Sequence, residues 1–173
     1  MNYFIYTMPL GRLTIVASDK GLTQILFGPQ VIEGVARRPS ALTNTAATQL
    51  QEYFAGKRHS FDLPLDPKGT DFQLKVWDEL KKIPYGEVRT YAQIAEAVGS
   101  PKGFRAVGLA NNKNPLPIVV PCHRVIGTGG KLVGYAAGIK IKRYLLELEG
   151  VDVDALNYCR RILARSQKIG PTL

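Results

Sequence analysis

The decisive stretch of this chain reads Asn114-Pro115-Leu116-Pro117-Ile118-Val119-Val120-Pro121-Cys122-His123-Arg124-Val125. It places one of only two cysteines in the sequence directly before one of only two histidines. A thiol beside an imidazole can act as a nucleophile, because the thiolate is the reactive form and a neighbouring base favours it. The alternative interpretation is a short apolar strand over residues 118–120 that ends in a small buried cysteine.

The size and composition of the chain indicate a globular protein of one domain or two small ones. Its 173 residues are 45% hydrophobic and 21% charged, which is ordinary for this class of protein. No apolar run approaches the roughly 20 residues needed to span a bilayer, and the amino terminus lacks the pattern of a signal peptide. Two isolated cysteines, Cys122 and Cys159, form neither a disulfide framework nor a zinc site. We therefore expect a cytoplasmic protein with no membrane partner.

The net charge of +9 is concentrated in one part of the chain. Residues 70–150 carry twelve basic and seven acidic side chains, and between residues 88 and 143 only Glu96 opposes nine Lys and Arg side chains. A segment of one sign around the candidate nucleophile indicates a polyanionic partner, with nucleic acid first. The alternative is the solvated face of a basic protein.

The first 69 residues are predicted to form a strand-rich domain that ends in a linker. Aromatic and β-branched residues predict three strands, at residues 3–7, 13–18 and 23–27. Glycine and proline predict a loop over 28–41, and apolar residues at helical spacing predict a helix over 43–55. The linker is placed at residues 59–69, which contain two prolines and a glycine.

Residues 70–150 are predicted to form a second, mostly helical domain. Thr70 or Asp71 can cap a helix that runs through residue 82, with Trp77 on its apolar face and in the core. Two short helices joined by a Gly-Ser-Pro turn follow, and they form either a DNA-binding helix–turn–helix or an ordinary pair of packed helices. The two short helices are predicted over residues 91–98 and 102–112. A further helix is predicted over 139–148, and another over 154–164 within the tail, which comprises residues 151–173.

The glycine-rich run at residues 127–131 predicts a turn between two short strands. A phosphate-binding loop would need glycine at position 125 and Ser or Thr at position 132, where the chain has Val125 and Leu132. The run is therefore not expected to bind a nucleotide.

The second domain contains a series of short motifs in a defined order. They are Phe72, Val76-Trp77, Pro84-Tyr85-Gly86-Glu87-Val88, Thr90-Tyr91, Arg105-Ala106-Val107-Gly108, Asn114-Pro115, Pro121-Cys122-His123-Arg124-Val125, Gly134-Tyr135, Leu145-Leu146 and Glu149-Gly150. Together they resemble the O6-alkylguanine-DNA alkyltransferases over about residues 70–150, whereas residues 1–69 resemble the family in length and strand-rich character alone. The fold that the resemblance implies is α/β (α+β), with an RNase H-like N-terminal domain and a mostly helical C-terminal domain that contains a winged helix–turn–helix.

The resemblance implies DNA repair by direct and irreversible transfer of an alkyl group to Cys122. The implied substrates are O6-alkylguanine and O4-methylthymine in double-stranded DNA, and the damaged nucleotide is flipped out of the duplex into a pocket. The resulting thioether has no carbonyl for water to attack, so the resemblance implies a cysteine S-methyltransferase of which each molecule acts once. No cofactor is implied. We expect a monomer, and clustering of several copies along DNA stays an open alternative.

The resemblance also implies roles for individual residues around the thiol. His123 takes the thiol proton, and Glu149 orients the imidazole; the alternative for Glu149 is a surface carboxylate at a helix end. Asn114 braces the turn around the site, or alternatively caps a helix. Tyr135, Ala136 and the backbone of Val125 line the base pocket.

Three further residues are implied to contact DNA. Arg105 fills the gap that the flipped base leaves, and its alternative is a phosphate contact or a solvated side chain. Tyr91 presses on the backbone beside the target nucleotide, and its alternative is a core aromatic. Thr128 is a candidate for a backbone contact. Some relatives bind zinc through the N-terminal domain, but here that domain has no cysteine, and His59 alone makes no metal site.

One departure from the family pattern affects the pocket. Ala136-Ala137-Gly138 follow Tyr135, where family members usually have Ser-Gly-Gly. The missing hydroxyl removes a hydrogen bond to the guanine oxygen, which keeps open an alternative function as a lesion sensor that does not repair. A second alternative is a cysteine hydrolase, which would need an oxyanion hole for which the sequence offers no sign.

Overall fold

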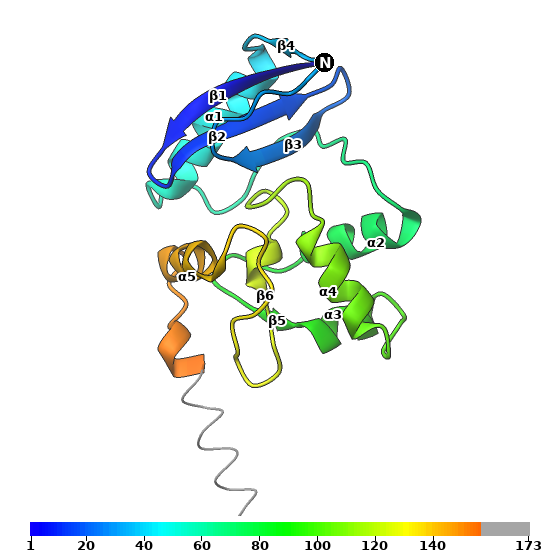
Figure 1. Cartoon of the computed structure of the whole chain (residues 1–173). Coiled ribbons are helices and arrows are strands. Elements are labelled where there is room, and N and C mark those ends of the chain that lie inside the picture. The colour runs from blue at the N-terminus through cyan, green and yellow to red at the C-terminus, as the bar shows by residue number, and fades with distance from the viewer. Residues whose placement is uncertain (157–173) are drawn as a thin grey trace, which may run out of the picture.

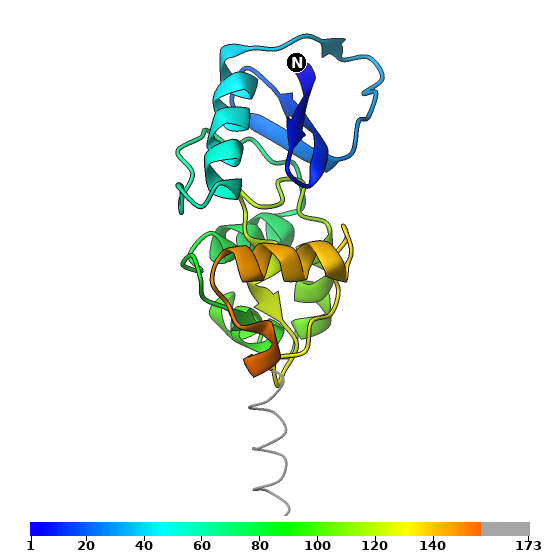
Figure 2. The same cartoon turned by 90° about the vertical axis from the view of Figure 1, so that its left-hand side faces the viewer.

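The computed structural model describes residues 1–156 and shows two halves stacked one above the other (Figure 1). The N-terminal half holds a four-stranded sheet and helix α1 (Ala41–Phe54). The C-terminal half holds the remaining helices and a two-stranded sheet. Figure 2 shows α1 along one face of the upper sheet and α5 (Ile139–Leu148) across the top of the lower half. The architecture is therefore the mixed α/β fold that the sequence predicts.

The N-terminal sheet has the strand order β3-β2-β1-β4. Its strands are β1 (Asn2–Met8), β2 (Gly11–Ala17), β3 (Leu22–Phe27) and β4 (Ala36–Arg37). The first three pair antiparallel, as their alternating apolar residues suggest. The prediction of a continuous loop over 28–41 is wrong, because β4 pairs in parallel with β1 there and Asn2 Nδ2 donates to the Arg38 carbonyl at 3.0 Å.

Helix α1 begins earlier than predicted because its cap lies upstream of the apolar pattern. Ser40 accepts from the Thr43 backbone, and the Thr43 hydroxyl accepts from the Ser40 backbone, so the two residues form a capping box. Ala46, Leu50 and Tyr53 then follow at helical spacing and are fully buried.

The segment over residues 59–69 crosses from one half to the other as an extended chain. Leu22 at the start of β3 donates to the Pro64 carbonyl and accepts from the Asp66 backbone, at 2.9 and 2.7 Å. A side chain at position 21 would collide with this segment, because a Cβ there would lie 2.7 Å from the Pro64 oxygen. Gly21 thus permits the segment to lie directly against the sheet.

Helix α2 (Asp71–Leu80) opens the C-terminal half and is capped by Thr70. It ends two residues before the predicted end, since Lys81 to Ile83 turn back in hydrogen-bonded turns. Trp77 is buried as predicted, and its indole nitrogen donates to the Ala110 carbonyl at 2.8 Å. This bond fixes α2 against helix α4 (Phe104–Asn112).

Two short helices and two short strands form the winged helix–turn–helix. Helix α3 (Tyr91–Ala97) is capped by Thr90, and α4 (Phe104–Asn112) begins two residues later than predicted, after a turn closed by Gly103. Strands β5 (Arg89–Thr90) and β6 (Val125–Ile126) pair in parallel beside them. The glycine-rich run forms the predicted turn after β6, closed by a hydrogen bond from Gly127 to the Lys131 carbonyl.

One continuous apolar core joins the two halves. It extends from Ile15 in the sheet through Tyr53 to Val107 and Leu145 in the helical half. Helix α5 occupies the predicted residues, 139–148. The predicted tail helix over 154–164 lies outside the described residues apart from its first turn, where residues 153–156 are helical, and Cys159 lies outside them as well.

Candidate active site

The segment before Cys122 is a compact turn, not a strand. The alternative of a strand over 118–120 is wrong, because Ile118 has a positive φ of 74° and Pro117 faces Val120 across a single bridge. Prolines lack the N–H that a strand ladder needs. Asn114 holds the turn as predicted from the resemblance: its Nδ2 donates to the Val120 carbonyl at 2.8 Å, and its Oδ1 accepts from the Leu116 backbone at 3.0 Å.

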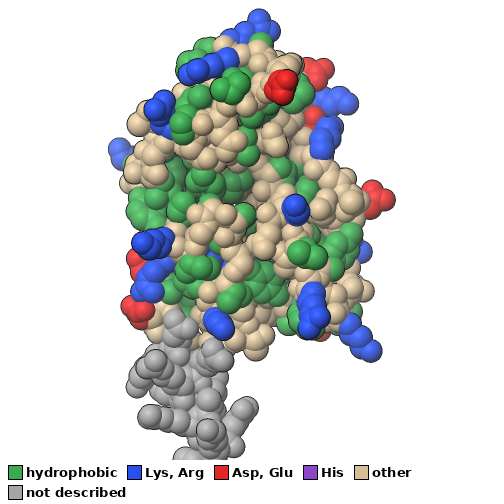
Figure 3. Space-filling model, in the orientation of Figure 1, with side chains coloured by type: hydrophobic (Ala, Val, Ile, Leu, Met, Phe, Trp, Pro, Cys, Tyr) green, Lys and Arg blue, Asp and Glu red, His purple; other side chains and the backbone are tan. Residues whose placement is uncertain are grey.

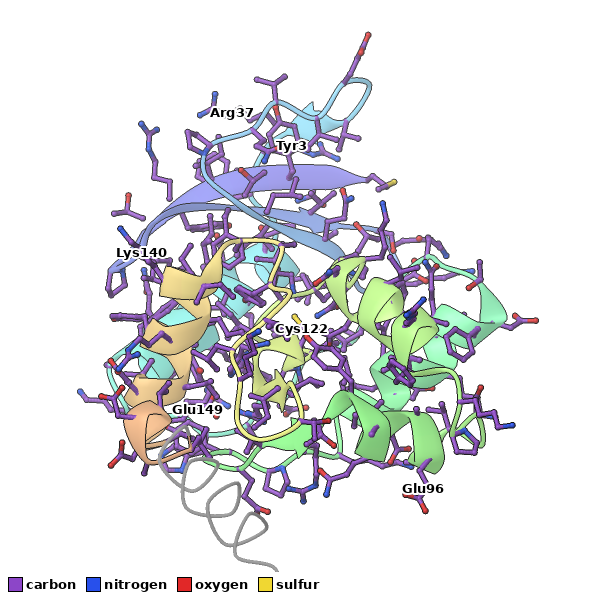
Figure 4. All side chains as sticks on the ribbon, turned by 60° about the horizontal axis from the view of Figure 1, so that its bottom comes forward. Tyr3, Arg37, Glu96, Cys122, Lys140 and Glu149 are labelled. Carbon is purple, nitrogen blue, oxygen red and sulfur yellow. The ribbon has the colours of Figure 1, made fainter. Side chains whose placement is uncertain are left out.

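The turn delivers Cys122 into the short helix η1 (Cys122–Arg124), at the edge of a cavity between the two halves. Figure 4 shows Cys122 near the centre of the molecule, with Glu149 beyond the far end of α5. The cavity has a volume of about 280 Å³. Its lining comes from β3 and the loop after it, from the end of α4 and from the loop before α5: Ile25, Leu26, Phe27, Gln30, Asn111, Asn112, Asn114, Pro115, Pro117, Cys122, Tyr135, Ala136 and Ala137.

Glu149 is buried, so the alternative of a surface carboxylate is wrong. Its Oε2 is 2.6 Å from His123 Nε2 and 3.1 Å from Arg124 Nη2, and its Oε1 is 2.7 Å from Arg124 Nε. The Gly86 backbone and the Tyr53 hydroxyl also donate to it, at 3.1 and 2.5 Å. A buried carboxylate is tolerated when it is paired and hydrogen-bonded in this way.

These contacts set the ionisation states of Glu149 and His123. Burial raises the pKa of Glu149, but the hydrogen bonds and charges of His123, together with hydrogen bonds from Arg124 and Tyr53, outweigh it and lower the pKa to about 2. Burial, with the charges of Arg124 and Lys142, lowers the pKa of His123 below its ordinary value, although Glu149 acts in the opposite direction. At neutral pH the pair is an ionised carboxylate and a neutral imidazole.

The neutral imidazole has one nitrogen available as a base. An ionised carboxylate can only accept hydrogen bonds, so His123 Nε2 carries the proton and Nδ1 carries the lone pair. Among the described residues, Nδ1 is buried and has no hydrogen-bond partner. Burial also raises the pKa of the Cys122 thiol, against the influence of Asn114 and the charge of Lys142. The thiol therefore rests protonated and needs a base when it reacts.

Lys142 is a buried cation that the sequence analysis did not single out. Its ammonium group donates to the carbonyls of Val125 and Val133, and burial lowers the pKa of Lys142 to about 8. The signal was present in the spacing: Lys142, Leu145 and Glu149 lie at i, i+3 and i+7 of α5 and share its buried face. A charged residue in an apolar stripe marks a position that needs a polar partner.

The predicted pocket residues separate into two groups. Tyr135 and Ala136 line the cavity, and the Tyr135 hydroxyl is buried without a partner among the described residues. Val125 is buried in β6, where its carbonyl accepts from Lys142, and it is not among the residues that line the cavity. Asn111, which the sequence analysis passed over, also lines the cavity; its Nδ2 donates to the Cys122 carbonyl at 3.3 Å.

The three predicted DNA contacts occupy different surroundings. Arg105 is exposed in the first turn of α4. Tyr91 is half-buried, and its hydroxyl donates at 3.0 Å to the Val133 carbonyl, in the loop that leads to Tyr135. Thr128 is exposed at the tip of the glycine-rich turn and is not among the residues that line the cavity.

The surface around the cavity carries both charge and apolar groups. Figure 3 shows Lys and Arg side chains around a band of hydrophobic side chains, with acidic side chains mainly at the margins of this face. On α4, Phe104 and Leu109 are 50% and 67% exposed. An exposed apolar and basic surface of this kind suits a polyanion that also offers apolar base or sugar surface.

Within residues 1–156, no group of three or more His, Cys, Asp or Glu side chains is arranged to hold a metal ion. No helix in the same range is both long enough and apolar enough to cross a membrane.

Family models and similar proteins agree on the class of this chain. Residues 71–151 match the model described as "6-O-methylguanine DNA methyltransferase, DNA binding domain", and residues 1–67 match "6-O-methylguanine DNA methyltransferase, ribonuclease-like domain". The chain is 50% identical over 154 residues to the methylated-DNA–protein-cysteine methyltransferase of Methanosarcina acetivorans, which covers 87% of this chain and 99% of the relative. It is 47% identical over 160 residues to the constitutive enzyme of that name in Bacillus subtilis, with coverages of 87% and 97%.

The fold agrees with a solved structure of similar sequence. The crystal structure of the Mycobacterium tuberculosis protein OGT in complex with DNA superposes with a TM-score of 0.81 at 45% identity, and the match covers 90% of this chain and 99% of that one. The chain therefore belongs to the 6-O-methylguanine DNA methyltransferase family.

Proposed function

We propose that this protein repairs DNA by transferring the alkyl group of a damaged base irreversibly to Cys122. The observation that carries the proposal is the position of the buried thiol, which lies on a cavity of about 280 Å³ directly before a histidine bound to a buried glutamate. The names of the curated relatives and the DNA complex of a similar protein support it.

The geometry supports a single displacement step. The alkyl carbon of a base in the cavity faces the Cys122 sulfur, which forms a bond to it while the bond from that carbon to the base oxygen breaks. His123 Nδ1 takes the thiol proton, directly or through one water, and the proton ends on the released base. The positive charge of Lys142 favours the thiolate as it develops. The product is a thioether, and the thiol is not regenerated.

We propose O6-alkylguanine in double-stranded DNA as the main substrate and O4-methylthymine as a second one, with one protein molecule acting on each lesion. Asn114, Tyr135 and Ala136 stand around the cavity where the flipped base would lie. Three residues act outside the cavity. Val125 supports the cavity through strand β6, and Tyr91 supports it through the hydrogen bond from its hydroxyl to the loop before Tyr135. Thr128 is exposed and contacts the DNA backbone.

The two alternative functions fit the site less well. A lesion sensor of this fold would need no acceptor thiol, whereas Cys122 stands at the cavity beside its base. The curated relatives named above are methyltransferases. A cysteine hydrolase would need backbone donors arranged around an oxyanion, and the chain around Cys122 is instead used to hold the turn.

The direct test is the intact mass of the protein after incubation with excess duplex DNA that contains one O6-methylguanine. We expect a gain of one methyl group per protein molecule, confined by peptide mapping to the peptide with Cys122. Tight lesion binding without any gain in mass would instead make the protein a sensor.

Replacing Arg105 with alanine is expected to slow repair of duplex DNA by about tenfold to a hundredfold, because flipping a nucleotide costs a few kcal/mol that a gap-filling side chain offsets. The reaction with a free O6-alkylguanine base should change little, since no duplex is opened. Single-turnover rates on both substrates check this. Lys113→Ala is the matched control, since it removes an exposed positive charge just past the other end of α4. Equal losses on both substrates would refute the gap-filling role.

Replacing Ala136 with serine is expected to strengthen binding of free O6-alkylguanine bases by about twofold to tenfold, because one new hydrogen bond contributes roughly 0.5–1.5 kcal/mol. Ala136 lines the cavity, and a serine hydroxyl there can donate to the guanine oxygen. Competition of the free base against methylated duplex measures the effect. Ala97→Ser, at an exposed position on α3, is the control. Unchanged competition would show that this position does not face the base oxygen.

A further inference from the structure

The N-terminal half reaches the catalytic carboxylate through one side chain. Tyr53, near the end of α1, is fully buried, and its hydroxyl donates to Glu149 Oε2 at 2.5 Å although 96 residues separate the two in sequence. Its ring is held by aromatic neighbours: the centroids of Phe54 and Phe61 lie 5.6 Å away, and that of Tyr85 lies 6.2 Å away. The hydroxyl therefore has a defined direction.

Packing alone does not require a hydroxyl at this position. A buried hydroxyl is costly unless it has a partner, and phenylalanine would fill the same space in the core. The only hydrogen bond of the Tyr53 hydroxyl among the described residues is the one to Glu149. Burial and the negative charge of Glu149 hold the pKa of Tyr53 well above its ordinary value, so the hydroxyl remains a donor at every working pH.

Tyr53 shares its acceptor atom with the catalytic histidine. Glu149 Oε2 accepts from the Tyr53 hydroxyl, from His123 Nε2 at 2.6 Å and from Arg124 Nη2 at 3.1 Å. Donors that converge on one oxygen divide its negative charge, so each added donor weakens the attraction of the carboxylate for the imidazole proton. Removal of one donor strengthens the bonds to those that remain.

We propose that Tyr53 is a positioning residue, through which the N-terminal half fixes Glu149 and limits the strength of its hydrogen bond to His123. The inference rests on the proposed role of His123 as the base for Cys122. In this arrangement the imidazole is held in place by Glu149 without being turned into a permanent cation, so Nδ1 stays ready to accept the thiol proton.

The pair formed by His123 and Glu149 is surrounded by titratable groups from each element that packs against it. They are Tyr85 from the turn after α2, Cys122 and Arg124 from η1, and Lys142 from α5. Arg124 and Lys142 both disfavour a charged imidazole, and they are unchanged by a substitution at position 53. A change at Tyr53 therefore reports on the shared oxygen of Glu149.

The test is Tyr53→Phe in the full chain, with Tyr85→Phe as the matched control. Both variants remove one phenolic hydroxyl from the same aromatic cluster, but the Tyr85 hydroxyl donates to the Leu148 carbonyl at 3.3 Å and not to Glu149. Melting temperatures establish that both variants fold. The measured quantities are the single-turnover rate of methyl transfer as a function of pH and the titration of the His123 ring by NMR, which is simple to assign because the chain has two histidines.

We expect Tyr53→Phe to raise the pKa of His123 by about half a unit to one unit. Because the reaction needs a neutral imidazole, the acidic limb of the pH–rate profile moves to higher pH by the same amount as the pKa. The rate at pH values well above this limb changes less than about twofold. Tyr85→Phe is expected to leave both the limb and the titration unchanged.

Two other outcomes are distinguishable. A wild-type pH profile and titration in Tyr53→Phe, with transfer lost in Glu149→Gln, would overturn the role of Tyr53 and leave the proposed function standing. Full methyl transfer in Glu149→Gln would show that the carboxylate itself is not needed. The proposed role of Glu149 in orienting His123 and the proposed role of Tyr53 would then both fail.

Discussion

Cys122→Ala is expected to abolish methyl transfer completely while the variant still binds methylated duplex DNA. The reaction needs a nucleophile at this one position, and the neighbouring Lys142 ammonium, which donates to two carbonyls, has no lone pair with which to replace it. The substitution removes one sulfur atom from the cavity edge and leaves the Asn114 turn intact. Transfer of a radiolabelled methyl group and a gel-shift measurement on the same DNA check both parts.

The other cysteine supplies the control for this prediction. Cys159→Ser should still accept one methyl group per molecule, since it keeps Cys122, which lines the cavity. Residual transfer to protein in Cys122→Ala, at any mapped site, would contradict the proposed mechanism. Loss of DNA binding in the same variant would show that the thiol also has a structural role.

Glu149→Gln is expected to lower both the stability and the rate. An amide cannot neutralise the buried Arg124, and breaking a buried pair by removing one partner costs about 3–5 kcal/mol. The amide also loses the charge that orients His123, and a positioned base contributes roughly 10²–10⁴-fold to such reactions. Urea unfolding and single-turnover rates measure the two effects separately.

A double variant separates the structural part from the catalytic part. Arg124→Met combined with Glu149→Gln leaves neither member of the Arg124–Glu149 pair as a buried charge without its partner, so much of the stability should return. The rate should stay low, because His123 still lacks its carboxylate. Recovery of the rate together with the stability would mean that Glu149 acts only by holding the fold.

The acid stability of the protein provides an independent check on Glu149. Its pKa is about 2 in the fold against an ordinary value of 4.5. The unfolded chain therefore binds a proton at Glu149 more readily than the folded chain does. The stabilisation of the fold by ionised Glu149 is present above pH 4.5 and is lost as the pH falls from 4.5 toward 2. This stabilisation is on the order of 3 kcal/mol. Glu149→Gln should lack this part of the pH dependence.

Much of the architecture could be predicted from local sequence signals. Helix α5 occupies the predicted residues, and the caps at Thr70 and Thr90 mark the starts of α2 and α3, because these signals act within a few residues of the chain. Strand β4 and the turn at Ile118 were missed for the opposite reason. A two-residue strand forms only because β1 offers an edge to it, and the positive φ of Ile118 is imposed by the Asn114 bonds.

The candidate site likewise has one part that the sequence predicts and another part that only the tertiary structure reveals. The motif around Cys122 and its neighbour His123 predicts a nucleophile and its base, and the resemblance adds Glu149 and Asn114. Neither indicates that Tyr53 from the other half of the chain shares an oxygen with His123, since nothing near Tyr53 in the sequence identifies a partner 96 residues away.

The sequence by itself determined the three long strands, the five helices, the basic segment, the candidate acceptor thiol and the family. The tertiary structure alone decided that Glu149 is buried under five hydrogen bonds, that Lys142 is enclosed, and that β3 forms one wall of the cavity beside Cys122. The physical reason is the separation along the chain over which each kind of interaction acts. Capping, turn formation and helical periodicity act between neighbouring residues, whereas burial and ionisation depend on which distant groups the packed core brings together.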